Sequence, residues 1–294
     1  MSNMGNMGNM GNMGNIGNQG GASGSAVLPD RVDLPFTTEE AQTWSRTGNA
    51  WTPAPAGKQV GDLPLMPVEA WPQRSWSAKW AAWLVVDEFA AADWRSSIQL
   101  APWDPDGQAA EVGQLIRAAQ DERPDALGEI VAQSGSYEDI MAYFLALLGI
   151  APDSHPKLNQ LLHVAGLVGI LAAMHFKEHP GTGLSPRPRP SQVCPALLPP
   201  LELPGHPSFP SGHATHAMLM AFCMEAALPA HGKNAWRPML HTLAGRIARN
   251  REIAGLHYPS DSRAGFELAG KVFDQLAKGP RFKAVLKAAL QEWH

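Results

Sequence analysis

Residues 210–228 read PSGHATHAMLMAFCMEAAL, in which a proline-rich stretch passes through Ser211, Gly212 and His213 into a long apolar run. The apolar run predicts a buried helix over 213–228. The free N–H groups of its first turn and the helix dipole favour a bound anion. Gly212 lets the backbone approach such an anion closely, and the Ser211 hydroxyl adds a hydrogen-bond donor. The corner between loop and helix is therefore a candidate anion site.

Helices are also predicted in most of the chain outside this run. No regular element is expected between 180 and 210, where prolines are frequent, and alternating strand patterns are nearly absent. A capping-box pattern at 37–40 indicates one short helix. The fold class is therefore predicted to be all-α, a helical bundle with an extra N-terminal helical lobe. Apart from 213–228, its helices are expected over 75–94, 107–121, 125–133, 137–150, 157–177, 234–254, 261–278 and 281–292.

Composition divides the chain into three parts. Residues 1–27 form a Gly-, Asn- and Met-rich tail that we expect to be disordered. Residues 28–134 form a Trp-rich lobe, whose tryptophans are expected to pack one lobe onto another. Residues 135–294 form the bundle that carries the candidate site. The net charge of −4 and the lack of a basic stripe argue against a nucleic-acid partner.

The cellular location is predicted to be cytoplasmic. The N-terminus has neither a basic region nor an apolar stretch of the kind that targeting segments carry. Residues 158–176 are nearly long enough to span a bilayer, but His163, Gly166, Gly169 and His175 interrupt them, so we interpret them as a core helix. Membrane contact is the alternative left open, and the sequence makes no prediction about oligomeric state.

Cations and histidines with regular spacing surround the candidate anion site. A phosphate monoester is a dianion, so its site needs positive charge and N–H donors. Arg189 and Arg251 each offer a planar pair of N–H groups to two oxygens, and Lys177 adds a point charge. These residue types in one chain favour phosphate or vanadate as the ligand.

Two histidines can divide a phosphoryl-transfer reaction between them. We expect His257 to attack phosphorus, with Asp261 holding the N–H on the far side of the ring so that the attacking nitrogen stays unprotonated. His213, protonated beside the anion, would donate a proton to the leaving oxygen and then act as the base that activates water.

These segments resemble the type 2 phosphatidic acid phosphatase and vanadium haloperoxidase superfamily. Its pattern is Lys-x6-Arg-Pro, then Pro-Ser-Gly-His, then Ser-Arg-x5-His-x3-Asp. The second segment matches fully, and the third matches with Asn250 in place of the serine. The first departs, because twelve positions rather than seven separate Lys177 from Arg189, as if residues 180–184 had been inserted. We favour Arg189 over Arg187 for the anion site and expect Arg187 to matter little.

The resemblance implies a helical bundle of the acid phosphatase and haloperoxidase type, in agreement with the predicted helices. It implies a phosphoric monoester hydrolase with a phosphohistidine intermediate, no cofactor and a small phosphorylated substrate. The first alternative is a vanadium haloperoxidase that takes a halide and peroxide, with His257 ligating vanadium and His206 near the halide or behind the site. The second is a non-catalytic phosphate-binding helical protein.

Overall fold

The structure, a computed structural model, describes residues 42–47, 50–55, 76–179 and 185–293. It divides the chain into the units Met1–Ser75 and Trp76–His294. In the first unit, strands β1 (Gln42–Thr47) and β2 (Ala50–Pro55) form an antiparallel hairpin. The sequence analysis did not predict this hairpin, because two prolines interrupt β2 and prolines disfavour a strand except at an edge. The tail over 1–27 and the helix start at 37–40 lie outside the described residues.

The second unit is helical, which confirms the predicted all-α class. Each predicted helix longer than one turn is found, with ends within a few residues of the expected ones. The short helices α2 and α7 were not expected, and α7 lies in the proline-rich stretch that we interpreted as irregular. The elements are α1 (Ala78–Ala91), α2 (Trp94–Ser97), α3 (Gln108–Asp121), α4 (Arg123–Ala132), α5 (Tyr137–Leu148), α6 (Pro156–Glu178), α7 (Pro190–Val193), η4 (Pro195–Leu197), α8 (Gly212–Ala227), α9 (Ala230–Ile253), α10 (Pro259–Leu276), α11 (Pro280–Leu290) and η5 (Gln291–Trp293).

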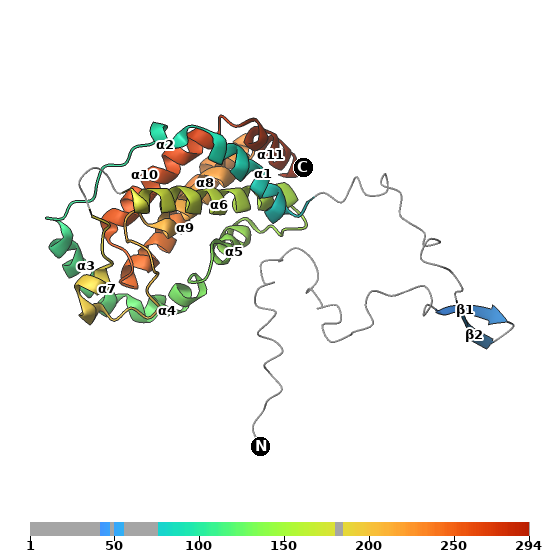
Figure 1. The fold of residues 1–294 in the computed structure, drawn as a ribbon, viewed down its shortest axis with the longest axis horizontal. Helices are drawn as coiled ribbons and strands as arrows, with labels where there is room; N and C mark the ends of the chain where they lie inside the picture. The colour runs from blue at the N-terminus through green and yellow to red at the C-terminus, as the bar shows by residue number, and fades with distance from the viewer. Residues whose placement is uncertain (1–41, 48–49, 56–75, 180–184, 294) are drawn as a thin grey trace, which may run out of the picture. The chain divides into compact units, whose positions relative to one another are not determined.

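Helices α6 and α8 form the centre of the bundle. Figure 1 shows α6 running through its middle, and α3, α4 and α7 lie at one end. Helix α6 packs against α1, α8 and α11, and α8 packs against α9 and α10 as well. The apolar faces of these helices form one continuous core. The N-terminus of α8 is consequently surrounded by other elements rather than exposed at the edge of the fold.

Two glycines allow neighbouring helices to approach α8 closely. A Cβ atom added at Gly169 of α6 would lie 2.8 Å from the Cβ and 2.9 Å from the Cα of His216. A Cβ atom added at Gly265 of α10 would lie 2.7 Å from the carbonyl oxygen of Ser211. Both distances are shorter than packed atoms allow, so only glycine fits at these two crossings. The position of α8 is therefore determined from both sides near its N-terminus.

Trp80 and Trp83 of α1, and Trp76 just before it, are exposed within the unit Trp76–His294. Trp76, Trp80 and Trp83 are 62%, 63% and 44% exposed, whereas the opposite face of the helix buries Val85 and Phe89. Within this unit the packed face of α1 is formed by Ala82, Val85, Val86 and Phe89. The compact unit begins inside the predicted lobe 28–134, so the boundary at residue 134 stays a prediction.

Candidate active site

The N-terminus of α8 has the geometry expected of an anion site. Ser211 caps the helix, its hydroxyl accepting from the Ala214 N–H at 3.3 Å, and its own N–H donates to the Asp261 carbonyl at 3.0 Å. A Cβ atom added at Gly212 would meet no atom within 4 Å. Open space therefore lies beside the first free N–H groups of a sixteen-residue helix, where negative charge is favoured.

The hydrogen bonds of His257 determine which of its ring nitrogens carries the proton. Nη1 of Arg189 lies 3.1 Å from Nε2 of His257, and an arginine can only donate, so Nε2 must be the acceptor. The proton is then on Nδ1, which donates to Oδ2 of Asp261 at 3.3 Å. Burial and the charge of Arg189 lower the pKa of His257 to about 3. The ring is thus neutral at pH 7 with a free electron pair on Nε2, as the sequence analysis expected.

Asp261 is fully buried and accepts hydrogen bonds at both oxygens. Oδ2 accepts from His257, from the Tyr258 N–H at 3.0 Å and from the Ser208 hydroxyl. Oδ1 accepts from Nη1 of Arg187 at 2.7 Å. Burial opposes the charge, but the hydrogen bond from His257, the charge of Arg187 and the hydrogen bond from Ser208 outweigh it and hold the pKa of Asp261 at about 2. The residue is therefore a carboxylate across the physiological range.

Arg189 reaches His257 despite the longer first segment. Besides Nε2 of His257, its Nη1 donates to the Leu256 carbonyl at 2.8 Å. Its Nη2 lies 3.1 Å from Nδ1 of His206, and its Nε donates to the His206 carbonyl at 3.2 Å. His206 therefore supports the guanidinium of Arg189 from behind. The residues interpreted as an insertion, 180–184, lie outside the described residues.

Lys177 and Arg251 bring two further cations to the site. The Lys177 ammonium donates to the carbonyls of Pro207, Ser208 and Pro210 at 2.6, 3.1 and 2.7 Å, so its N–H groups hold the loop that precedes Ser211. Arg251 is buried and donates from Nη2 to the Ile130 carbonyl at 2.6 Å. Its Nε has no hydrogen-bond partner within the described ranges, and an unpartnered buried guanidinium N–H is suited to an anion.

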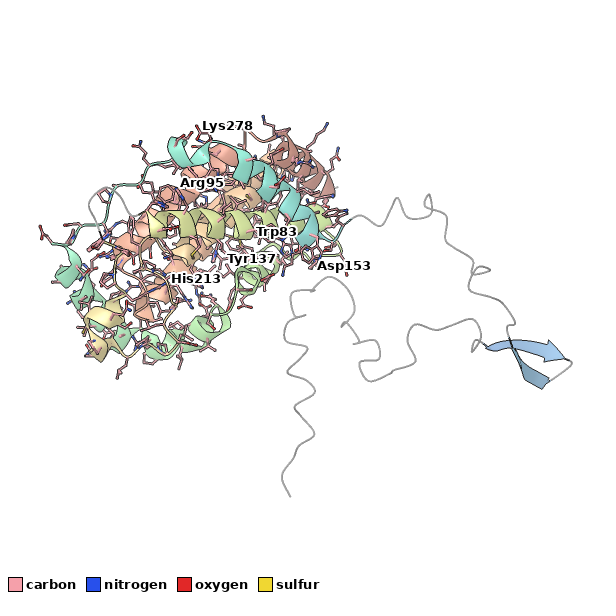
Figure 2. The ribbon with its side chains drawn as sticks, viewed as in Figure 1. Trp83, Arg95, Tyr137, Asp153, His213 and Lys278 are labelled. Carbon is pink, nitrogen blue, oxygen red and sulfur yellow. The ribbon has the colours of Figure 1, made fainter. Side chains whose placement is uncertain are left out.

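His213 is fixed by helix α4. Its Nε2 lies 3.0 Å from the Gln133 carbonyl, which only accepts, so Nε2 carries a proton. A second proton would go to Nδ1. Figure 2 shows the residue among the packed side chains of the bundle. Burial, with the nearby charge of Arg251, lowers the pKa of His213 well below its usual value. The expectation of a protonated His213 therefore requires the charge of a bound dianion to offset these effects.

The sequence analysis missed two charged residues that contact this network. Arg187, expected to matter little, is buried and forms an ion pair with Asp261. Glu111 of α3 accepts from Nη2 of Arg187 at 2.7 Å. The repeated Arg-Pro at 187–190 pointed to Arg187, but nothing in the sequence pattern connected Glu111 with Arg187, 76 positions later.

Parts of the chain are similar to known proteins. Residues 158–273 match the PAP2 superfamily. The decaprenylphosphoryl-5-phosphoribose phosphatase of Mycobacterium tuberculosis is 29% identical over 180 residues, which cover 60% of this chain and 93% of the relative. A transmembrane PAP2 type phosphatidylglycerolphosphate phosphatase from Bacillus subtilis aligns with a TM-score of 0.43 at 16% identity, covering 69% of this chain and 96% of that structure.

The cytoplasmic location predicted from the sequence is wrong. Helix α6 of the present chain is long and apolar enough to cross a membrane, although most of it is buried in the bundle. The histidines and glycines taken to exclude a span in α6 do not lower its mean hydropathy enough to do so.

Proposed function

We propose that the protein is a phosphoric monoester hydrolase that acts through a phosphohistidine intermediate on His257. The observation that carries the proposal is the hydrogen-bond pattern of this ring, with Nδ1–H held by Asp261 and the electron pair of Nε2 facing Arg189. A site that only bound phosphate would need cations and N–H groups but no such oriented imidazole. The proposed reaction needs no metal or other cofactor.

Binding of the substrate dianion relies on two kinds of donor, arginine side chains and backbone N–H groups. Oxygens of the phosphoryl group accept from Arg189, from Arg251 and from the N–H groups at the start of α8. An oxygen that takes the Nη1–H of Arg189 also releases the electron pair of His257 from its present hydrogen bond. Substrate binding and activation of the nucleophile are thereby coupled.

The chemistry then proceeds in two displacements. Nε2 of His257 forms a bond to phosphorus while the bond to the leaving oxygen breaks, and His213 donates a proton to that oxygen. The imidazolium character that develops on His257 is stabilised by the carboxylate of Asp261. Water, deprotonated by His213, attacks phosphorus, the phosphorus–nitrogen bond breaks, and inorganic phosphate leaves.

The substrate class is the less specific part of the proposal. The Mycobacterium tuberculosis relative is named for a lipid-linked phosphosugar, and we infer a phosphomonoester of this kind as one candidate beside small soluble phosphomonoesters. The relatives described above are named as phosphatases, and nothing in them supports the haloperoxidase alternative.

Phosphate release and intermediate trapping test the proposed function. We expect the purified chain to hydrolyse p-nitrophenyl phosphate or a polyprenyl-linked sugar phosphate, with orthovanadate as a competitive inhibitor because its trigonal bipyramid resembles the transition state. Acid-labile, alkali-stable phosphate should be found on His257 after quenching. Absence of hydrolysis of both substrates, or vanadate inhibition that is not competitive, would refute the assignment.

A further inference from the structure

We propose that Glu111 of helix α3 is a positioning residue for the reaction, which acts on the nucleophile through Arg187 and Asp261. The inference rests on the proposed function. Residue 111 lies outside the region 158–273 that matches the PAP2 superfamily, so no comparison assigns it a role. The chain of contacts runs from Glu111 to Arg187, from Arg187 to Asp261 and from Asp261 to His257.

Glu111 makes three short contacts with the segment that carries the site. Oε1 accepts from the backbone N–H of Ser260 at 2.6 Å, and Oε2 accepts from the hydroxyl of Ser260 at 2.7 Å and from Nη2 of Arg187 at 2.7 Å. Ser260 lies in the first turn of α10, where N–H groups are free and a carboxylate is favoured. The same carboxylate thus fixes both the residue before Asp261 and the arginine paired with Asp261.

The position of Arg187 decides which oxygen of Asp261 is available to His257. Nη1 of Arg187 donates to Oδ1 of Asp261 at 2.7 Å and to the Ser260 hydroxyl at 2.7 Å, while Nη2 is held by Glu111. Oδ2 is therefore left for the imidazole. Without the carboxylate of Glu111, the guanidinium can turn both arms onto Asp261, because a bidentate pair is the favoured geometry. That arrangement competes with His257 for Oδ2.

Few charged groups surround Glu111, so the effect of removing its negative charge can be assigned to one partner. Its side chain is 13% exposed, and Arg187 is fully buried against the ring of Tyr258. The one other cation near Glu111 in the described residues is the exposed Arg263, at 4.0 Å. Removal of the Glu111 charge should therefore act mainly on Arg187, whose ion pair with Asp261 stays intact.

The test compares Glu111→Gln with the control Glu122→Gln. Like Glu111, Glu122 precedes residues 158–273, but it pairs with Arg249 on α9. We expect Glu111→Gln to lower kcat by on the order of ten- to a hundredfold, as when the partner that orients a reactive side chain is removed, with KM changed less than about threefold. Ring ¹⁵N NMR at pH 7 should show that His257 no longer holds its proton solely on Nδ1. Glu122→Gln should match the unsubstituted protein in both measurements.

Other results would overturn the inference. Glu111→Gln with an unchanged kcat and the same His257 tautomer would do so, as would equal losses in Glu122→Gln. If Glu111→Gln does not fold, Arg187→Lys takes its place, because lysine keeps the charge but cannot bridge Glu111 and Asp261, and it should lower kcat to the same extent. If the unsubstituted protein lacks phosphatase activity, the proposed function fails, while the NMR tautomer still decides the role of Glu111.

Discussion

Replacement of Asp261 by asparagine changes the hydrogen-bonding partner of Nδ1 of His257 but keeps the size of the side chain. Asp261 accepts four hydrogen bonds, from Arg187, His257, Ser208 and the Tyr258 N–H. An amide has only one oxygen to accept them, and its NH₂ group would favour a proton on Nε2 of His257. That nitrogen would then face the N–H of Arg189, donor against donor, and would lack its electron pair. By analogy with triads in which the tautomer is reversed, we expect kcat to fall on the order of 10³–10⁴-fold.

The same substitution should also lower the free energy of unfolding, and two lines of reasoning give the approximate size of this loss. The pKa of Asp261 lies at about 2, below its ordinary value of 3.8, which corresponds to roughly 2 kcal/mol at 1.36 kcal/mol per pH unit. Removal of one partner of a buried ion pair costs roughly 3–5 kcal/mol, and Arg187 keeps Glu111 as a partner, so a loss of about 2–3 kcal/mol is expected. Because the native pKa is lowered, this stability is present above about pH 4 and is lost as the pH falls through 2.

Guanidinium unfolding and steady-state kinetics measure the two effects separately. The matched control is Asp274→Asn, which replaces an exposed aspartate of the same helix. This substitution should change neither the free energy of unfolding nor kcat. At pH 7 the Asp261→Asn protein should unfold at lower denaturant concentration, and the difference from the unsubstituted protein should shrink as the pH approaches 2. Retention of more than about a tenth of kcat, or an unchanged unfolding free energy at pH 7, would refute the reasoning.

Further predictions concern the reacting groups. His257→Ala should abolish turnover and phosphoenzyme, while the exposed-site control His231→Ala retains both; measurable turnover in His257→Ala would exclude the proposed nucleophile. His213→Ala should slow an alkyl phosphate by on the order of 10²–10⁴-fold and p-nitrophenyl phosphate much less, because only the alkoxide needs the proton; equal effects on both would contradict its role as an acid. Arg189→Ala should weaken phosphate binding, measured by calorimetry, at least about tenfold through loss of a charge-assisted hydrogen bond, whereas Arg237→Ala should not.

The helices were predictable because their signals are local. Proline is the first residue of α6, α10 and α11, and Ser211 precedes α8; apolar residues recur at helical spacing after these positions. The tryptophans of α1 show the limit of this reasoning, since spacing identifies a face but not whether another element covers it. The hairpin β1–β2 shows another limit, because the prolines of β2 hid a strand from the sequence analysis.

The site was predictable where chemistry and spacing lie in the same short segment. His257 and Asp261 are four residues apart across the start of α10, so their hydrogen bond follows from local geometry. Glu111 and the carbonyls of Ile130 and Gln133 come from α3 and α4, and only the folding of distant helices brings them to the site. A backbone carbonyl acceptor cannot be identified from the sequence, because every residue has one.

Gly169 and Gly265, at the two crossings of α8, are needed for the geometry of the site although they have no reactive group. A methyl group at position 169 or 265 would meet backbone and Cβ atoms, which cannot rotate away. Helix α8 would have to shift, and His213 with the anion-binding N–H groups would shift with it. A related chain that keeps every histidine and arginine of the motifs but bears a larger residue at either crossing is therefore expected to have lost the enzyme's geometry. Glycine at these two positions is therefore expected to distinguish active relatives from inactive ones that keep the motifs.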